Sequence, residues 1–407
     1  AIEQGYGLEY RPSDFLRTKN EIALRNKEFT REFELQGRQN RRGLLIRSAT
    51  DIEVPSEVLK SSFFYEVNTQ RKAILQETYI EVGPELGVYT WVDQNNDGIQ
   101  QIDEFFPELT PNEGTFVRQF LPSDELLPIV TLNGRMRHQA RPFDLLKEQL
   151  PFLGQIRINT GLTIRESSTS GSLADVYLLR LNTFRNDSTT IQGSYLTDNE
   201  LELAPEYEKW DVWLRYNAGQ NLNRRAGELQ RGRTELYEAE AAYRPSYTTT
   251  ISLRSSLGIN SSDSDRLTAR NFDIRELKME PALNLIINRS LSTRFTATWA
   301  RRNDRAPLEH AEADVLKFKV ESQAYLFRKI QTNIRSEIRN IRLQNQTSSF
   351  GFFELTEGLG EGTNMIWSVN ASYNISSVVR FVLNYDGRKV QNGQGIHTER
   401  VTITADC

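Results

Sequence analysis

The sequence lacks any long hydrophobic run. No stretch of about eighteen consecutive apolar residues occurs in its 407 residues, so a protein that crosses a membrane with helices is excluded. Apolar residues make up 38% of the chain, and the mean hydropathy is -0.55. This low value does not argue for a water-soluble protein, because in a membrane-spanning β-barrel only the lipid-facing residues, every second one, must be apolar.

Cysteine and histidine are also scarce, and neither sign of charge is in large excess. The single cysteine, Cys407, excludes an intrachain disulfide and a multi-cysteine metal site. The 50 basic and 54 acidic residues nearly cancel, and without a basic block nucleic acid is not expected as a partner. His138, His310 and His397 have no second ligand at metal-binding spacing, and no serine, histidine and acid grouping stands out. We therefore do not expect an enzyme.

What the sequence does contain is a clear period of two between residues 271 and 344, where we predict four consecutive strands. The alternation is clearest over residues 316–326. Apolar residues share one face there and charged residues share the other: Leu316, Phe318 and Val320 against Lys317, Lys319 and Glu321. Each such strand has one face suited to lipid and one suited to water.

The same pattern extends over most of the chain. We predict four strands within residues 3–68, of which 27–36, 43–54 and 59–68 are the clearest, although the charge of residues 21–34 also suits an exposed helix. Further strands are predicted at 131–141, 155–165, 173–184, 209–221, 233–243, 247–259, 364–374, 378–390 and 395–405, with a short amphipathic helix at 143–150. With the four central strands the count is about seventeen, within two either way.

The predicted fold is all-β, an antiparallel up-and-down transmembrane β-barrel of about 16–18 strands, or part of one, with a surface insertion. Residues 1–69 hold the first barrel strands, 70–130 the insertion, and 131–407 the main meander. Because such barrels usually close with an even number of strands, we expect at least one further strand upstream of Ala1. A secretory signal is expected either to have been removed or to lie further upstream. The alternative is a soluble β-sandwich, whose strands are usually shorter than these runs of about eleven to fifteen residues.

The lengths of the connections predict an orientation. Tight turns at 244–246, 288–290, 328–331 and 375–377 should be periplasmic, and the long loops at 301–313 and 344–363 should be extracellular. Aromatic residues near both sets of connections are expected to form the two interfacial girdles. A strand at 189–196 would be an eighteenth and would invert everything before it.

One motif in the insertion carries chemistry. Residues 93–104 fit the D-x-[DN]-x-[DN]-G-x5-E pattern of calcium-binding loops, in which alternating oxygen ligands surround one cation and a glycine permits the sharp turn. The predicted ligands of a Ca²⁺ ion are Asp93, Asn95, Asp97, the Ile99 carbonyl, Gln101 and Glu104. Because a β-type segment precedes the loop, it is not a standard EF-hand, and an acidic solvated turn is the alternative.

Several segments of the insertion resemble a protein family. These are 64–67 (FYEV), 79–82 (YIEV), 87–99 (GVYTWVDQNNDGI), 103–105 (DEF) and 116–122 (FVRQFLP). They are similar to large, mostly uncharacterised outer-membrane β-barrel proteins of Bacteroidota-type bacteria. The resemblance implies a large barrel with a surface insertion and a place in a multi-protein assembly of the outer membrane. The chain departs from outer-membrane barrels in ending on Cys407 rather than on an aromatic residue.

Three functions compete at this point. The first expectation is a structural or scaffolding barrel of the outer membrane, surrounded by lipid, whose loops hold other outer-membrane proteins or lipoproteins. The alternative is a transport channel for a polar solute or a secreted substrate. Its predicted lumen residues are Arg215, Arg254, Lys317, Lys319, Glu321, Arg335, Glu337 and Arg339. A membrane-embedded hydrolase is the third and least favoured.

Overall fold

The computed structural model describes residues 2–27, 41–54, 58–84, 86–108, 113–142, 156–169, 187–203, 209–225, 228–306, 310–327, 329–345, 349–375, 379–391 and 393–405. Its strands in chain order are β1 (Ile2–Ser13), β2 (Leu16–Lys27), β3 (Arg41–Glu53), β4 (Leu59–Glu81), β5 (Tyr89–Trp91), β6 (Phe105–Pro107), β7 (Phe116–Ala140), β8 (Ile156–Ser168), β9 (Thr190–Leu203), β10 (Trp210–Arg225), β11 (Glu228–Ser246), β12 (Thr249–Ser264), β13 (Phe272–Asn288), β14 (Leu291–Asp304), β15 (Ala311–Leu326), β16 (Ile330–Gln344), β17 (Gly362–Asn374), β18 (Val379–Lys389) and β19 (Gly395–Ala405). The short helices are η2 (Ile102–Glu104), η6 (Thr268–Arg270) and α3 (Ser349–Thr356).

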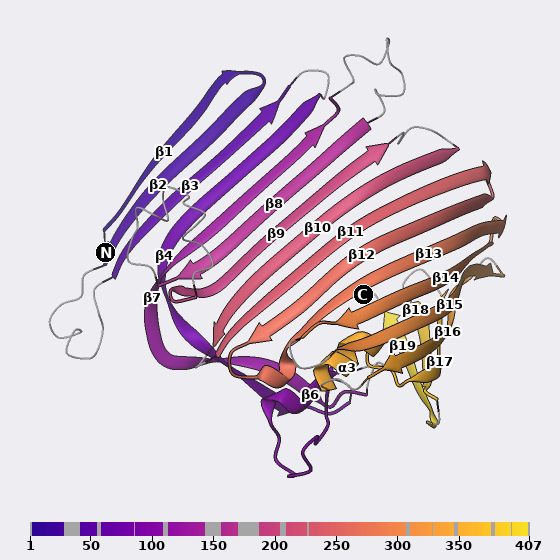
Figure 1. Ribbon diagram of the computed structural model, residues 1–407. Coiled ribbons are helices and arrows are strands. Elements are labelled where there is room, and N and C mark those ends of the chain that lie inside the picture. Colours follow the sequence, from indigo (N-terminus) through magenta and orange to yellow (C-terminus); the bar gives the residue numbers. More distant parts are fainter. Residues whose placement is uncertain are drawn as a thin grey trace.

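The strands form one antiparallel sheet of up-and-down order. From β7 to β19 each long strand pairs with the one that follows it in the chain, and β4 pairs with β7 across the insertion. The sheet curves from β1 at one side to β19 at the other (Figure 1). The predicted fold class, an all-β antiparallel up-and-down wall that forms a barrel or part of one, is confirmed. The described residues hold 17 long strands, as predicted.

The two faces of the sheet follow the predicted alternation. On β15, Phe318 is 54% exposed and stands opposite Ile338 of β16, whereas Lys317 on the other face stands opposite Arg339. We call the apolar side the outer face and the charged side the inner face. The register keeps both faces continuous from strand to strand, which is why local alternation was enough to assign them.

The connections also sort by rim. Short turns join β11 to β12, β13 to β14 and β15 to β16 at one end of the strands, which we call the turn rim. The connections that carry η6 and α3 lie at the opposite end, the loop rim, together with the insertion between β4 and β7. The insertion and the long loops therefore share one rim, as expected from seventeen strands.

The strand that follows β8 in the sheet lies later in the chain than predicted. The alternative strand at 189–196 is present as part of β9, at Thr190–Leu203, but it pairs directly with β8 and β10 and is therefore not an additional eighteenth strand. Because β9 takes the place given to 173–184, the order of rims is unchanged. The predicted segments 173–184 and 143–150, and 28–36 of the predicted strand 27–36, lie outside the described residues. Residues 21–27 belong to β2, so the helical alternative is wrong there.

The insertion begins inside the sheet. Pairing of β4 with β7 continues past residue 70, shifts register between Ala73 and Leu75, and then runs on to Glu81 and Phe116. The parts of the insertion next to β4 and β7 are therefore continuations of these two strands. Pro122 and Pro128 are tolerated because this part of β7 lies at a bulge and extends beyond the body of the sheet.

No helix in the described ranges is long and apolar enough to cross a membrane.

Candidate functional site: the charged inner face and the loop rim

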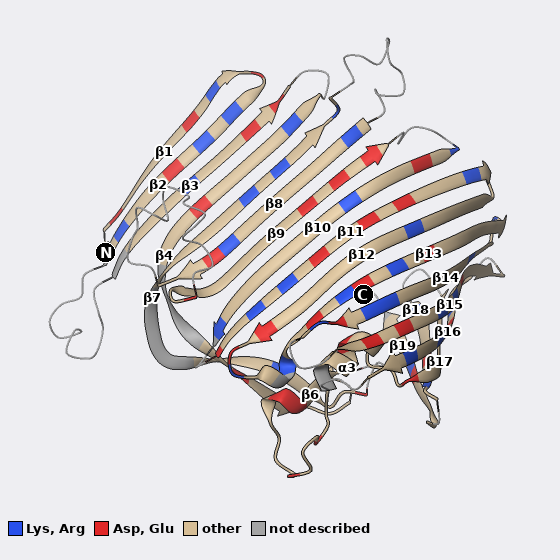
Figure 2. Ribbon diagram, in the orientation of Figure 1, with Lys and Arg blue, Asp and Glu red and all other residues tan. Residues whose placement is uncertain are grey.

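The inner face from β9 to β13 carries a ladder of ion pairs between neighbouring strands. Arg215 on β10 lies 2.9 Å from Glu200 and 3.5 Å from Glu238, one on each flanking strand. Arg254 on β12 lies 2.6 Å from Glu240 and 3.9 Å from Glu280 in the same way. Figure 2 shows acidic and basic positions distributed across these strands. The ladder makes this part of the inner face polar, with acidic and basic side chains paired across neighbouring strands.

The predicted lumen residues all belong to this inner face. Their strands pair in a register that places them on the same side: Arg215, Arg254, Lys317, Lys319, Glu321, Arg335, Glu337 and Arg339. Lys319 and Glu321 are 3.0 Å apart, and Arg335 and Glu337 are 2.9 Å apart. As expected, many of these charges pair with one another.

The connection between β16 and β17 folds back onto the inner face. Within it, Leu355 at the end of α3 is 0% exposed and packs against Ile274, Ala311 and Ala313 of the sheet. Leu359 is similarly buried in a second cluster of inner-face residues, namely Ala300, Val315 and Ile341. At the loop rim the inner face is thus apolar and covered by α3 and the residues after it.

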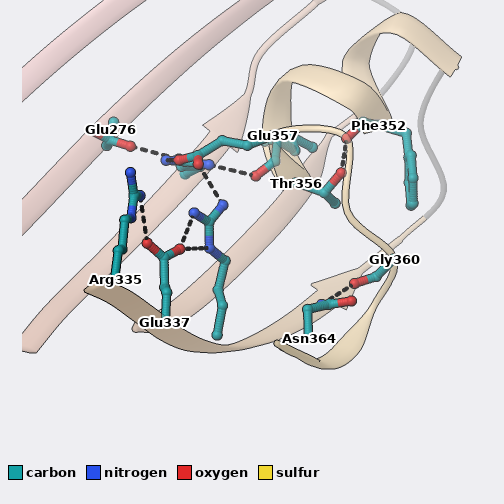
Figure 3. A network of polar contacts seen from close by, with 11 residues as sticks. Glu276, Arg335, Glu337, Phe352, Thr356, Glu357, Gly360 and Asn364 are labelled. Carbon is teal, nitrogen blue, oxygen red and sulfur yellow. Dashed lines mark hydrogen bonds and ion pairs between the residues drawn. The ribbon is translucent and has the colours of Figure 1, made fainter. Parts of the chain in front are cut away.

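A carboxylate fixes this segment in place. Glu357 lies directly after α3 and forms ion pairs with Arg302 of β14 and Arg339 of β16 (Figure 3). The two arginines are oriented by further carboxylates, since Arg302 lies 2.6 Å from Glu276 and the Arg339 Nε donates to Glu337 at 3.1 Å. Burial disfavours the charged form, but the attraction of the two guanidinium groups outweighs it and lowers the pKa of Glu357 to about 2.

The backbone of Glu357 confirms that the position is constrained. Its φ is +54°, in the left-handed region, and Gly358 follows at +74°. A non-glycine residue is uncommon in that region and is retained where the surroundings determine its conformation. The pair of residues reverses the chain so that α3 and Leu359 both contact the sheet.

The insertion forms an arm that crosses the loop rim. Its aromatic side chains pack along its length, with the Tyr79 and Phe105 rings stacked at 4.0 Å and the Phe105 and Phe116 rings edge to face at 5.0 Å. Burial among these rings raises the pKa of Tyr79, whose hydroxyl donates to Glu77 at 2.8 Å. The arm is a packed structure with its own small core.

The arm contacts three separate elements, two short helices and one strand. These contacts are ion pairs to η6 and β18 and a ring contact to α3: Glu77 with Arg270 at 3.5 Å, Glu113 with Arg388, and Phe106 with Phe353 at 5.9 Å. In a flat sheet β4 and β18 would be roughly 58 Å apart at about 4.8 Å per strand, whereas residues 75–81 extend only about 23 Å. The sheet therefore has to curve around the arm, as Figure 1 shows.

The predicted calcium loop lies at the tip of this arm. Asp93 accepts from the Gly98 N–H at 2.9 Å, and Asp97 accepts from the Asn95 and Gln101 side-chain amides at 2.8 and 2.7 Å. Gly98 has a φ of +72°, as the sharp turn requires. Four of the predicted side chains are thus gathered around one turn, which fits a calcium loop.

Glu104, the last of the predicted ligands, does not join the other four side chains at this turn. Glu104 is buried and accepts a hydrogen bond from Trp91 Nε1 at 2.9 Å and from the backbone of Gln94 at 3.2 Å. The Trp91 hydrogen bond lowers the pKa of Glu104. Among the described residues no three His, Cys, Asp or Glu side chains are arranged to hold a metal ion. Calcium binding, including the Ile99 carbonyl, stays a prediction.

The histidines make contacts that the sequence did not suggest. His138 Nδ1 lies 2.7 Å from Ser61 Oγ on the outer face, where β7 and β4 pair these residues directly. His397 Nδ1 lies 2.8 Å from the Tyr385 hydroxyl. In the described part of the chain no carboxylate is bonded to either ring, so neither pair forms a catalytic triad.

No protein-family model and no curated protein matches the sequence. Among solved structures, the chain is similar to the FrpB iron transporter from Neisseria meningitidis, with TM-score 0.41, 8% identity and coverage of 99% of this chain and 72% of that one. It is also similar to the ferric yersiniabactin uptake receptor FyuA from Yersinia pestis, with TM-score 0.38, 9% identity and coverage of 98% and 70%. For OccK5 (OpdH) from Pseudomonas aeruginosa the values are 0.33, 9%, 98% and 94%. Values this low transfer no function.

Proposed function

We propose that the chain forms the wall of an outer-membrane β-barrel and that its inner face lines a pathway for a polar solute or a secreted substrate. The observation that carries this proposal is the contrast between the two faces of one continuous sheet. On neighbouring strands the outer face exposes large apolar side chains: Leu253, Leu257, Leu277, Met279, Phe295, Phe318, Val320, Ile334 and Ile338. Water-soluble proteins rarely expose an apolar patch that extends over so many strands.

The dimensions suit a bilayer. A tilted strand of about 9–11 residues crosses the hydrocarbon core, and the 17 long strands have between 11 and 25 residues. In an antiparallel up-and-down sheet the interior strands satisfy their backbone hydrogen bonds with their neighbours, as the absence of water in a bilayer demands. The ion-pair ladder of the inner face then faces an aqueous interior.

The loop rim supports a restricted rather than an open pathway. α3 covers part of the inner face there, and the arm reaches from β4 to β18 across the rim. Ion pairs contribute to holding both, through Glu357 for α3 and through Glu113 and Glu77 for the arm. Passage of a large substrate would require at least one of these contacts to open.

The scaffolding function remains the second candidate, and the tip of the arm favours it. This tip exposes apolar side chains to solvent, among them Leu86 at 70% and Ile99 at 64%, with Val88 and Val92 nearby. Such side chains are suited to bury against another outer-membrane protein or a lipoprotein. Partner binding at the tip and passage along the inner face are compatible functions.

Conductance in planar bilayers tests the proposed pathway. Protein refolded in detergent and inserted into the bilayer should give stepwise ionic currents, and deletion of residues 349–359 should raise the current per step because it uncovers the inner face. Insertion without any current, with or without this deletion, would reject the pathway and leave scaffolding. Co-purification of other outer-membrane proteins that is lost when Leu86 and Ile99 are changed to Ser would support scaffolding.

A further inference from the structure

One sector of the inner face differs from the ion-pair ladder. Arg135 and Arg137 of β7 and Arg165 of β8 lie on the inner face and are exposed. Within the described residues none of them forms an ion pair, whereas Arg215 and Arg254 lie within 3 Å of carboxylates. Three guanidinium groups without an ion pair therefore lie close together on one side of the inner face.

The register explains why these arginines are unpaired. The residues directly opposite each of them are neutral: Phe64 and Thr163 for Arg135, Ser62 and Gly161 for Arg137, and Asn133 and Ser194 for Arg165. The nearest inner-face carboxylate on the following strand, Asp198, lies opposite Gly161. Its carboxylate fills the space over Gly161, where a Cβ atom would lie 2.5 Å from either oxygen, and it forms no ion pair with Arg137 among the described residues. Glu66, on the other side, pairs with Arg47 at 2.7 Å.

The three arginines line a hollow of about 660 Å³ on β7 to β13. Its lining contains no aspartate or glutamate, and its only other charged residue, Arg233, pairs with Glu235 at 2.6 Å. The remainder of the lining is rich in amide and hydroxyl groups, including Asn221, Asn223 and Gln230. Asn221 occupies the space over Gly232, where a Cβ atom would lie 2.4 Å from its Oδ1. The hollow thus offers many hydrogen-bond donors and no negative charge.

We propose that this hollow binds oxyanion groups, carboxylates or phosphates, of a polar solute, and that it makes the pathway selective for anions. The predicted anion selectivity rests on the proposed function as a pathway, whereas anion binding in the hollow does not depend on it. Guanidinium groups donate paired, charge-assisted hydrogen bonds to planar oxyanions, and side-chain amides add neutral donors. Fixed positive charge on a pore wall also raises the local concentration of anions within about a Debye length.

The test uses the variant Arg135→Gln/Arg137→Gln/Arg165→Gln. Its matched control is Glu240→Gln/Arg254→Gln, which also removes inner-face charge but leaves the net charge of the wall unchanged. In a tenfold potassium chloride gradient the wild type and the control should give reversal potentials that indicate preference for chloride. The triple variant should lose this preference. A triple Arg→Lys variant should retain it, because charge rather than geometry determines ion preference.

A second measurement does not require conduction. Titration calorimetry in detergent with citrate and with pyrophosphate should show binding to the wild type and at least about tenfold weaker binding to the triple Gln variant, because several charge-assisted hydrogen bonds are lost. Whichever of citrate and pyrophosphate binds with the higher affinity identifies the preferred oxyanion, carboxylate or phosphate. Binding without any current would reject the pathway but keep the site. Currents with unchanged selectivity, together with equal binding by wild type and triple variant, would overturn the inference. Heat-modifiable migration shows that each variant is folded.

Discussion

A charge placed on the outer face should be far more damaging than the loss of one on the inner face. Val320 lies on the outer face of β15, is 37% exposed, and stands between Phe295 and Ser336 on the flanking strands. It is six residues from the turn-rim end of β15 at Leu326. At about 3.3 Å per residue and a tilt near 40°, this places it roughly 15 Å from that rim, close to the middle of the hydrocarbon core.

The magnitude follows from this depth. Val320→Arg should destabilise the folded barrel by about 2 to 4 kcal/mol, the cost of an arginine at the bilayer midplane. Glu321→Gln, one residue further on, removes only the ion pair with Lys319, whose atoms are 3.0 Å apart. Because the Glu321 side chain is 37% exposed, that loss should be about 0 to 1 kcal/mol.

Reversible unfolding in urea from lipid vesicles measures both values. Heat-modifiable migration gives an independent estimate of the folded fraction. Equal destabilisation by the two substitutions would mean that the faces are assigned wrongly or that the sheet does not span a bilayer. Strong destabilisation by Glu321→Gln alone would mean that the charged face, and not the apolar face, is the one removed from water.

Three further predictions concern the loop rim. Glu357→Gln should weaken the attachment of α3 by about 1–2 kcal/mol. The pKa of about 2 by itself implies a larger loss of attachment free energy, but the Glu357 side chain is 42% exposed, so solvent screens its ion pairs. Because the pKa of Glu357 is lowered, the attachment of α3 should be complete above pH 4.5 and lost as the pH falls toward 2. Hydrogen exchange of the α3 amides measures this attachment. Exchange that responds neither to the substitution nor to the pH would contradict the prediction. Arg388→Glu should release the arm from β18 and raise the conductance, and the charge-swapped variant Glu113→Arg/Arg388→Glu should restore the wild-type conductance. Equal conductance of the wild type and the single variant would show that this contact does not restrict the current. Calcium should protect the arm tip from limited proteolysis, and Glu104→Ala should make it cleavable with or without chelator; equal protection in all four samples would show that packing alone holds the loop.

The strands that could be predicted are those whose two faces differ chemically. On β15 apolar and charged residues alternate without exception from Leu316 to Glu321, so the signal is local and independent of the rest of the chain. β9 was only weakly indicated because its outer positions include Thr197 and Asn199 rather than large apolar residues. The β-type segment before the calcium loop was predicted and is β5, but the extension of β4 and β7 into the arm was not, because prolines usually interrupt strands and tertiary position decides when they are tolerated.

Contacts between distant segments could not be predicted from alternation. The pattern assigns a side chain to a face, but it does not say which residue of another segment meets it on a curved sheet. Glu113 and Arg388 are 275 positions apart, and nothing in either local sequence indicates the other. The clamp on Glu357 similarly joins a loop to two strands that lie 55 and 18 positions away.

The arginines of the inner face show this limit most clearly. Arg135 and Arg215 look alike in the sequence, since both alternate with outward-facing residues on strands of similar composition. Their difference arises from register alone: Arg215 stands between Glu200 and Glu238, and Arg135 stands between Phe64 and Thr163. A shift of pairing by two residues would keep every side chain on its face and still exchange a neutralised arginine for a free one. The electrostatic character of the inner face is therefore determined by strand pairing, which only the folded sheet reveals.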